Sequence, residues 1–182
     1  MKTMLKNVRL SFPTLFKPET FGGEGDPVYS ASFIFPPGSD AAKAIEAAIE
    51  GAAKEKWADK APAALKALRA AGKVCLHDGD AKDYDGYAGN LYVSTRSKTR
   101  PTLLNRDKTP VAEADGVLYG GCYVNALLDV WAQDNAFGKR INATLKGVQF
   151  VRDGDAFGGG APASADDFPD ESESEESASD LF

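Results

Sequence analysis

Hydrophobic and polar positions alternate in the first part of the chain, before a helical spacing replaces the alternation. Residues 2–10 mix β-forming side chains with cations, and Val28–Phe35 is an apolar and aromatic run that stops at Pro36-Pro37-Gly38. Both segments are typical of strands. The connection from Phe12 to Asp26 contains two prolines and a glycine pair, so we expect a loop there.

A helical insertion follows the second predicted strand. Ser39 or Asp40 can cap a helix in which alanine and isoleucine repeat at helical spacing as far as about Trp57. A second, shorter helix is predicted from Pro62 to Ala71, because Gly72 ends its pattern. Period-two spacing then returns in three predicted strands, Gly89–Lys98, Val117–Trp131 and Arg140–Val151. The chain therefore reads as a mainly β domain with one helical insertion.

One predicted strand carries different chemistry on its two faces. If residues 90–101 are extended, the apolar Leu91 and Val93 point to one side, because successive side chains alternate. Cations and a ring on the other side suit a single-stranded nucleic acid, since a ring stacks on a base for about 1–3 kcal/mol. An edge strand protected by its charges gives the same pattern, and this alternative stays open. The second face holds Tyr92, Ser94, Arg96, Lys98 and Arg100.

Further aromatic side chains lie on the more polar face of the next predicted strand. Tyr123 and Trp131 share this parity, and each ring alone fits a structural role as well as base stacking. We expect Tyr92 and Tyr123 to stack on bases first, with Trp131 and Phe12 as further candidates. A predicted hairpin tip at residues 137–140 combines a ring with two cations, which suits it to close over a bound nucleic-acid strand. Contacts to the nucleic-acid backbone are expected from Arg9, Arg96, Lys98, Arg100, Lys139 and Arg140.

An acidic loop at Asp78–Tyr87 raises the possibility of a metal site. Closely spaced carboxylates in a glycine-bearing loop can bind Ca²⁺ or Mg²⁺, but the loop lacks the glutamate that ends a calcium-binding loop. A turn in which Asp and Gly serve backbone geometry explains the same residues. We therefore predict no metal or cofactor. A metal-dependent nuclease remains an alternative, with a hydrolytic water positioned by Asp78, Asp80, Asp83 and Asp85.

Charge divides the chain into a basic body and an acidic tail. Residues 153–182 hold ten of the 27 carboxylates and no Lys or Arg, so residues 1–152 carry all 21 cations against 17 carboxylates. A body of charge +4 therefore carries a tail of −10, which suggests a polyanion-binding body. The chain ends in Asp180-Leu181-Phe182, whose apolar pair would fit a pocket on a specific partner protein.

The remaining composition bounds the compartment and the domain count. Two cysteines are too few for a disulfide framework, and the N-terminus lacks the apolar core of a signal peptide. No window approaches the roughly 20 apolar residues of a membrane span, so we expect a soluble, cytosolic protein. We expect a domain at residues 1–155 and a disordered acidic tail at 156–182.

A series of motifs occurs in order along residues 5–155. They are Asn7–Pro13, Asp78-Gly79-Asp80, Asp85-Gly86-Tyr87, Ser97–Pro101, Gly120–Asn125 and Val148–Gly154. In this combination the chain resembles the single-stranded DNA-binding protein family of tailed phages. It departs from the family pattern at His77, where a cation is more usual, and this weakens a phosphate-binding role for that position.

The resemblance implies an OB-fold, a five-stranded partly open barrel that binds single-stranded DNA without sequence preference and is not an enzyme. It also implies a role in phage replication and recombination, in the cytoplasm of the infected bacterial host. An OB barrel can accommodate a helical insertion between its third and fourth strands, with the helices covering one end.

The acidic tail is expected to recruit replication or recombination proteins and to compete with DNA for the basic groove. An adaptor whose main task is recruitment, with DNA binding secondary, is the alternative.

Overall fold

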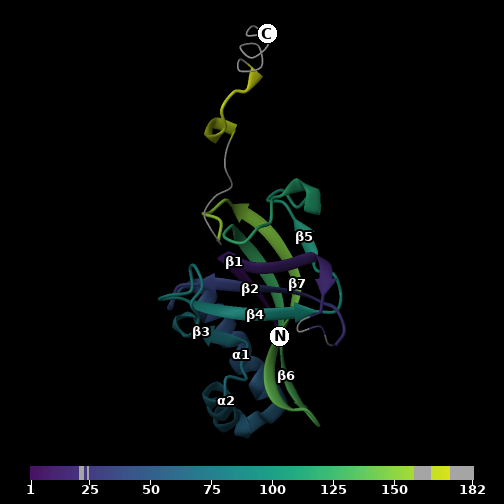
Figure 1. Cartoon of the computed structure of the whole chain (residues 1–182). Helices are drawn as coiled ribbons and strands as arrows, with labels where there is room; N and C mark the ends of the chain where they lie inside the picture. The colour runs from purple at the N-terminus through teal and green to yellow at the C-terminus, as the bar shows by residue number, and fades with distance from the viewer. Residues whose placement is uncertain (21–22, 24, 158–164, 173–182) are drawn as a thin grey trace.

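The computed structural model describes residues 1–20, 23, 25–157 and 165–172 (Figure 1). The strands are β1 (Lys2–Glu19), β2 (Val28–Phe35), β3 (Leu76–Asp78), β4 (Leu91–Ser97), β5 (Thr102–Leu104), β6 (Tyr123–Asn135) and β7 (Gly138–Arg152). The helices are α1 (Asp40–Trp57) and α2 (Ala61–Ala70). The mainly β architecture with a helical insertion is therefore as predicted.

Five of the strands form a closed barrel. They follow the order β4, β2, β1, β6 and β7, and β7 returns to β4 in a parallel pairing at Arg96 and Thr144. The short strand β3 adds to the outside of β4, and β5 adds to β7. Figure 1 shows β1, β2 and β4 stacked across the front of the barrel. The predicted five-stranded barrel is confirmed, in closed form.

Strand β1 is long because bulges let it serve two neighbours. Its first half pairs with β6 and its second half with β2. The pairing shifts between Ser11 and Thr14, where Phe12 has a φ of +46°, and a bulge of this kind bends a strand and tolerates a proline such as Pro13. The prediction of a loop from residue 12 onward was therefore wrong as far as Glu19.

Other boundaries also differ from the sequence-based expectation. The strand expected from Val117 begins only at Tyr123, because the chain turns before it, with Gly121 at a φ of +115°. The helices lie between β2 and β3, not between a third and a fourth strand. Strands β3 and β5 were missed, since three residues are too short to show a period.

The helices cover one end of the barrel, as predicted. Helix α1 begins at a serine cap, where the Ser39 side chain accepts the Ala42 N–H at 3.3 Å. Its buried face, including Ile45 and Ile49, belongs to the main core and contacts β1 and β6. Figure 1 shows both helices at the lower end, beside the β6–β7 hairpin. Among the described residues, neither helix has the length and apolar character needed to span a bilayer.

Candidate nucleic-acid interface

Two hollows on the barrel surface meet at Ser94 and Arg96, and together we call them the groove. The first, of about 460 Å³, lies over β1, β2 and β4 and is bordered by Phe12. The second, of about 680 Å³, lies where β4 meets the β6–β7 hairpin and is bordered by Trp131 and Arg140. The groove therefore crosses β4 and runs over the place where the barrel closes.

The hairpin end of the groove holds an oriented ring and a cation. Trp131 is 42% exposed, and its Nε1 donates to the Thr144 hydroxyl at 3.0 Å. This bond fixes the indole while much of its surface stays open to a planar partner. Arg140 on β7 and Arg96 on β4 line the same hollow. Four predicted residues, Phe12, Arg96, Trp131 and Arg140, are thus brought together along one groove.

The other end of the groove is bordered by Phe12, whose ring contacts a second exposed ring, Tyr84, in an adjoining hollow. Phe12 is 59% exposed and Tyr84 is 52% exposed, and their ring centroids lie 4.9 Å apart at 73°. Tyr87 lies behind them and donates a hydrogen bond from its hydroxyl to that of Ser11 at 3.0 Å. The bulge in β1 carries Phe12, and bulges commonly redirect a side chain in this way. Tyr84 was not among the predicted residues, and its signal was a tyrosine three positions before another in a polar loop.

Tyr92 does not present an open ring, which corrects the expectation that it stacks on bases. The alternation along β4 is as predicted, with Val93 and Thr95 buried and Arg96 exposed. However, the loop before β4 folds over the start of the strand, so that Tyr92 is only 7% exposed and packs with Tyr87. Burial, followed by the neighbouring tyrosines, raises the pKa of Tyr92.

Arg9 and Tyr123 lie outside the groove, in a cluster at one end of the barrel. The guanidinium of Arg9 donates to the carbonyl oxygens of Gly121 at 3.0 Å and Asp155 at 2.6 Å. The Tyr123 ring lies 5.7 Å from this guanidinium and 3.7 Å from that of Arg152. These contacts give both residues structural partners. Tyr123 lies on the same, less buried face of β6 as Trp131, as predicted, but it does not line the groove, and stacking of a base on it stays a prediction.

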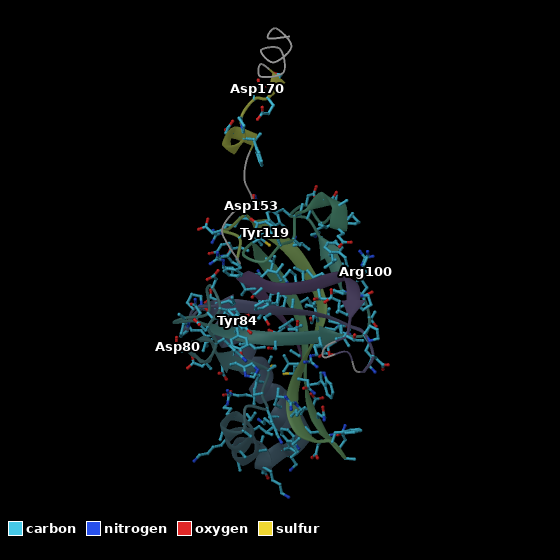
Figure 2. All side chains as sticks on the ribbon, in the orientation of Figure 1. Asp80, Tyr84, Arg100, Tyr119, Asp153 and Asp170 are labelled. Carbon is cyan, nitrogen blue, oxygen red and sulfur yellow. The ribbon has the colours of Figure 1, made fainter. Side chains whose placement is uncertain are left out.

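The remaining predicted cations line neither hollow of the groove. Lys98 lies 3.4 Å from a carboxylate oxygen of Asp26, with both side chains exposed, so this ion pair contributes little to stability. Arg100 lies 5.9 Å from the Phe16 ring, and Lys139 lies 5.9 Å from the Trp57 ring on α1. Figure 2 shows Arg100 at the opposite end of β4 from Tyr84.

The acidic loop uses its carboxylates for backbone geometry. Asp78 accepts the Asp80 N–H at 2.9 Å, and Asp80 accepts the Gly89 N–H at 2.7 Å, as expected for a turn. Within the described part of the chain, no three His, Cys, Asp or Glu side chains are grouped to hold a metal ion. Burial raises the pKa of Cys75 to about 12, which keeps this thiol protonated at neutral pH, and burial followed by the charges of Lys82 and Arg140 lowers the pKa of His77.

Phe157, which precedes a gap in the described residues, lies beside the groove. Ordered contacts continue to Phe157, two residues beyond the expected domain boundary, and its ring lines a third hollow together with Phe12 and Tyr84. The predicted partner-binding residues Asp180, Leu181 and Phe182 lie outside the described residues.

Comparison with known sequences places the chain among phage proteins. A family model described as "Enterobacter phage Enc34, ssDNA-binding protein" matches residues 1–178. A relative from Acyrthosiphon pisum secondary endosymbiont phage 1, "Putative protein p50", is 45% identical over 179 residues, which are 97% of each chain.

Comparison with solved structures gives the same architecture. The single-stranded DNA-binding protein from bacteriophage Enc34, solved in complex with single-stranded DNA, superposes with a TM-score of 0.70 at 30% identity. The match covers 86% of this chain and 89% of that one. The single-stranded DNA-binding protein gp2.5 of bacteriophage T7 has a TM-score of 0.56 at 15% identity, over 93% and 97% of the two chains, and shows the shared OB-fold alone.

Proposed function

The chain belongs to the family of the single-stranded DNA-binding protein of Enterobacter phage Enc34, and from this premise we propose that it binds single-stranded DNA along the groove. The family model and the matching structures describe single-stranded DNA-binding proteins, which gives the nuclease alternative no support.

The observation that carries the proposal is the arrangement of rings and cations along one path. The exposed rings of Phe12 and Tyr84 lie at one end, Arg96 lies in the middle, and Trp131 lies at the other end. A strand crossing β4 along this path would stack bases at both ends while cations approach its phosphates. Stacking accepts every base, so binding of this kind has no sequence preference.

We further propose that the protein serves phage DNA replication and recombination inside the infected bacterium, and that the tail recruits partner proteins. The support is the acidity of the tail and the apolar pair Leu181-Phe182 at its end, since acidity alone would not require apolar residues. The alternative is an adaptor in which DNA binding is secondary. It predicts that a variant unable to bind DNA still recruits partner proteins.

A titration over a range of salt concentrations, comparing single-stranded with duplex DNA, tests the proposed function. We expect tighter binding to the single strand at every salt concentration. Equal or tighter binding to the duplex would contradict the proposal.

Trp131 allows the path to be observed directly. The sequence contains two tryptophans, and Trp57 is held away from the groove by a hydrogen bond to Asp134 at 2.9 Å. In a Trp57→Phe variant, added oligothymidine should quench the fluorescence of Trp131, because bases stack on the exposed indole. Duplex DNA provides the control. Binding seen by anisotropy without any quenching would place the strand elsewhere.

The two arginines of the groove should determine part of the salt dependence. Replacing Arg96 or Arg140 by alanine should make the log–log salt slope shallower by roughly 0.7 for each lost phosphate contact on a single strand. Lys66 is a matched control, since it is an exposed cation on α2, at the end of the barrel that the helices cover. If Lys98→Ala and Arg100→Ala lowered the slope while the groove variants did not, the strand would run along β4 instead of across it.

A further inference from the structure

We infer that residues 153–157, which we call the anchor segment, contribute to DNA binding by positioning another part of the site. They hold the loop at residues 79–90, and with it Tyr84, in the position needed for base stacking. This role is separate from that of the acidic residues that follow. The inference rests on the proposed function, which assigns the exposed ring of Tyr84 to DNA.

Hydrogen bonds fix the anchor segment to the end of the barrel. The Phe157 N–H donates to the carbonyl oxygen of Gly120 at 2.9 Å, and Arg9 donates to that of Asp155 at 2.6 Å. The Tyr119 hydroxyl lies 3.0 Å from a carboxylate oxygen of Asp153. Figure 2 shows Tyr119 and Asp153 together above the barrel. The segment is therefore bound at its beginning, its middle and its end.

The backbone of the segment lies directly on the backbone of the turn before β6. A Cβ atom at Gly121 would overlap the carbonyl oxygen of Asp155, and one at Gly154 would overlap the carbonyl oxygen of Gly121. Such a close approach is possible only for glycine at both positions. The chain thus has two glycines where a larger residue would push the anchor segment off the barrel.

The ring of Phe157 supports the loop that carries Tyr84. One side of the ring faces Arg9, whose guanidinium carbon lies 4.2 Å from the centroid, and the ring packs with the buried Tyr87 and Tyr92. The loop backbone rests on it at Gly86, where a Cβ atom would lie only 2.8 Å from Cζ of Phe157. Gly86 lies between Tyr84 and Tyr87, so the ring supports the middle of this aromatic stretch.

Loss of this support should affect stacking and leave the charges of the groove unchanged. Tyr87 remains attached to Ser11, and Asn90 donates to the Gly86 carbonyl oxygen at 2.8 Å, so the loop keeps its other bonds. Tyr84 is exposed, and its ring lies 4.9 Å from that of Phe12 and 5.4 Å from that of Tyr87, so its position depends on the loop that Phe157 supports at Gly86. Arg96 and Arg140 line the groove beyond this region.

Substitution of Phe157 in the full-length chain tests the inference. Phe157→Ala should weaken binding to oligothymidine by about fivefold or more, in the range of one lost stacking contact, at an unchanged salt slope. Phe157→Leu should restore part of the affinity, because it refills the space under Gly86. Phe168→Ala, an exposed ring farther along the chain, should bind like the wild type.

A double-variant cycle separates positioning from a general loss of stability. If Phe157 acts through Tyr84, adding Phe157→Ala to Tyr84→Ala should lower the affinity little further. Gly86→Ala disturbs the same contact from the loop side, because its added methyl group meets the ring and its φ is +83°. It should reproduce the loss even if Phe157→Ala folds poorly.

Two outcomes would overturn the inference. One is wild-type affinity in both Phe157→Ala and Gly86→Ala at an unchanged melting temperature, and the other is full additivity of Phe157→Ala with Tyr84→Ala. Either result leaves the proposed function standing. Failure of the wild-type protein to bind single-stranded DNA would instead remove the proposed function itself.

Discussion

Removal of residues 158–182 is expected to tighten binding to single-stranded DNA by about tenfold at low salt. The deleted segment holds eight carboxylates and no cation, and it is attached at Phe157, beside the aromatic end of the groove. A tethered polyanion has a high effective concentration at a nearby basic site and competes there with DNA. The deletion leaves the anchor segment in place, so it removes the competitor without removing support for Tyr84.

The salt dependence of this effect identifies its cause. At about 1 M salt the Debye length falls to roughly 3 Å, so the truncated and full-length proteins should bind alike. A full-length variant with Asn and Gln at the eight acidic positions is the control, and it should match the truncation. Equal affinity of all three proteins at low salt would show that tail and groove do not communicate. A chain ending at Arg152 should bind more weakly than one ending at Phe157.

Substitution of the last two residues should abolish the binding of partner proteins to the tail. Leu181→Ala combined with Phe182→Ala keeps every carboxylate, so competition with DNA should persist while partner proteins no longer bind. Retained partner binding in this variant would assign recruitment to acidity alone.

Loss of both exposed rings, Phe12 and Tyr84, at the aromatic end of the groove should weaken binding strongly. Phe12→Ala and Tyr84→Ala should each lower the affinity by about 1–3 kcal/mol, or roughly 5- to 150-fold, because each removes a stacking surface. The ring centroids lie 4.9 Å apart, so the double variant should lose less binding free energy than the sum of the two single losses. Fluorescence anisotropy with labelled oligothymidine at one fixed salt concentration measures these losses.

Conservative replacements provide the control for these two positions. Phe12→Tyr and Tyr84→Phe keep a ring and should bind within about twofold of the wild type, whereas leucine at either position keeps apolar area but loses stacking. Wild-type affinity in both alanine variants would remove this end of the groove from the DNA path.

Local patterns predicted the longer elements but not what covers them. The alternation along residues 91–97 correctly separated buried Val93 from exposed Arg96, because side-chain parity is a property of the strand itself. Parity gives no information on what lies over a face. Tyr92 therefore looked as open as Arg96, although the loop at residues 79–90 covers it.

The groove as a whole was beyond the reach of the sequence, because distant segments build it. Arg96 and Trp131 come together only through the pairing of β4 with β7, and no local pattern encodes that contact. Arg9 was expected to contact a phosphate, because it is a cation in a predicted strand, but distant segments give it structural partners instead. Its partners are carbonyl oxygens at positions 121 and 155, more than a hundred residues away.

The parallel pairing of Arg96 with Thr144 makes the junction of β4 and β7 a seam, and the proposed path of the DNA crosses it. A DNA strand bound there would contact both β4 and β7 and hold the two strands together. Because such a ligand binds the closed barrel better than the opened one, its binding energy adds to the stability of the closure. The protein would then be most stable with DNA bound, and the bound DNA would in turn favour the closed barrel.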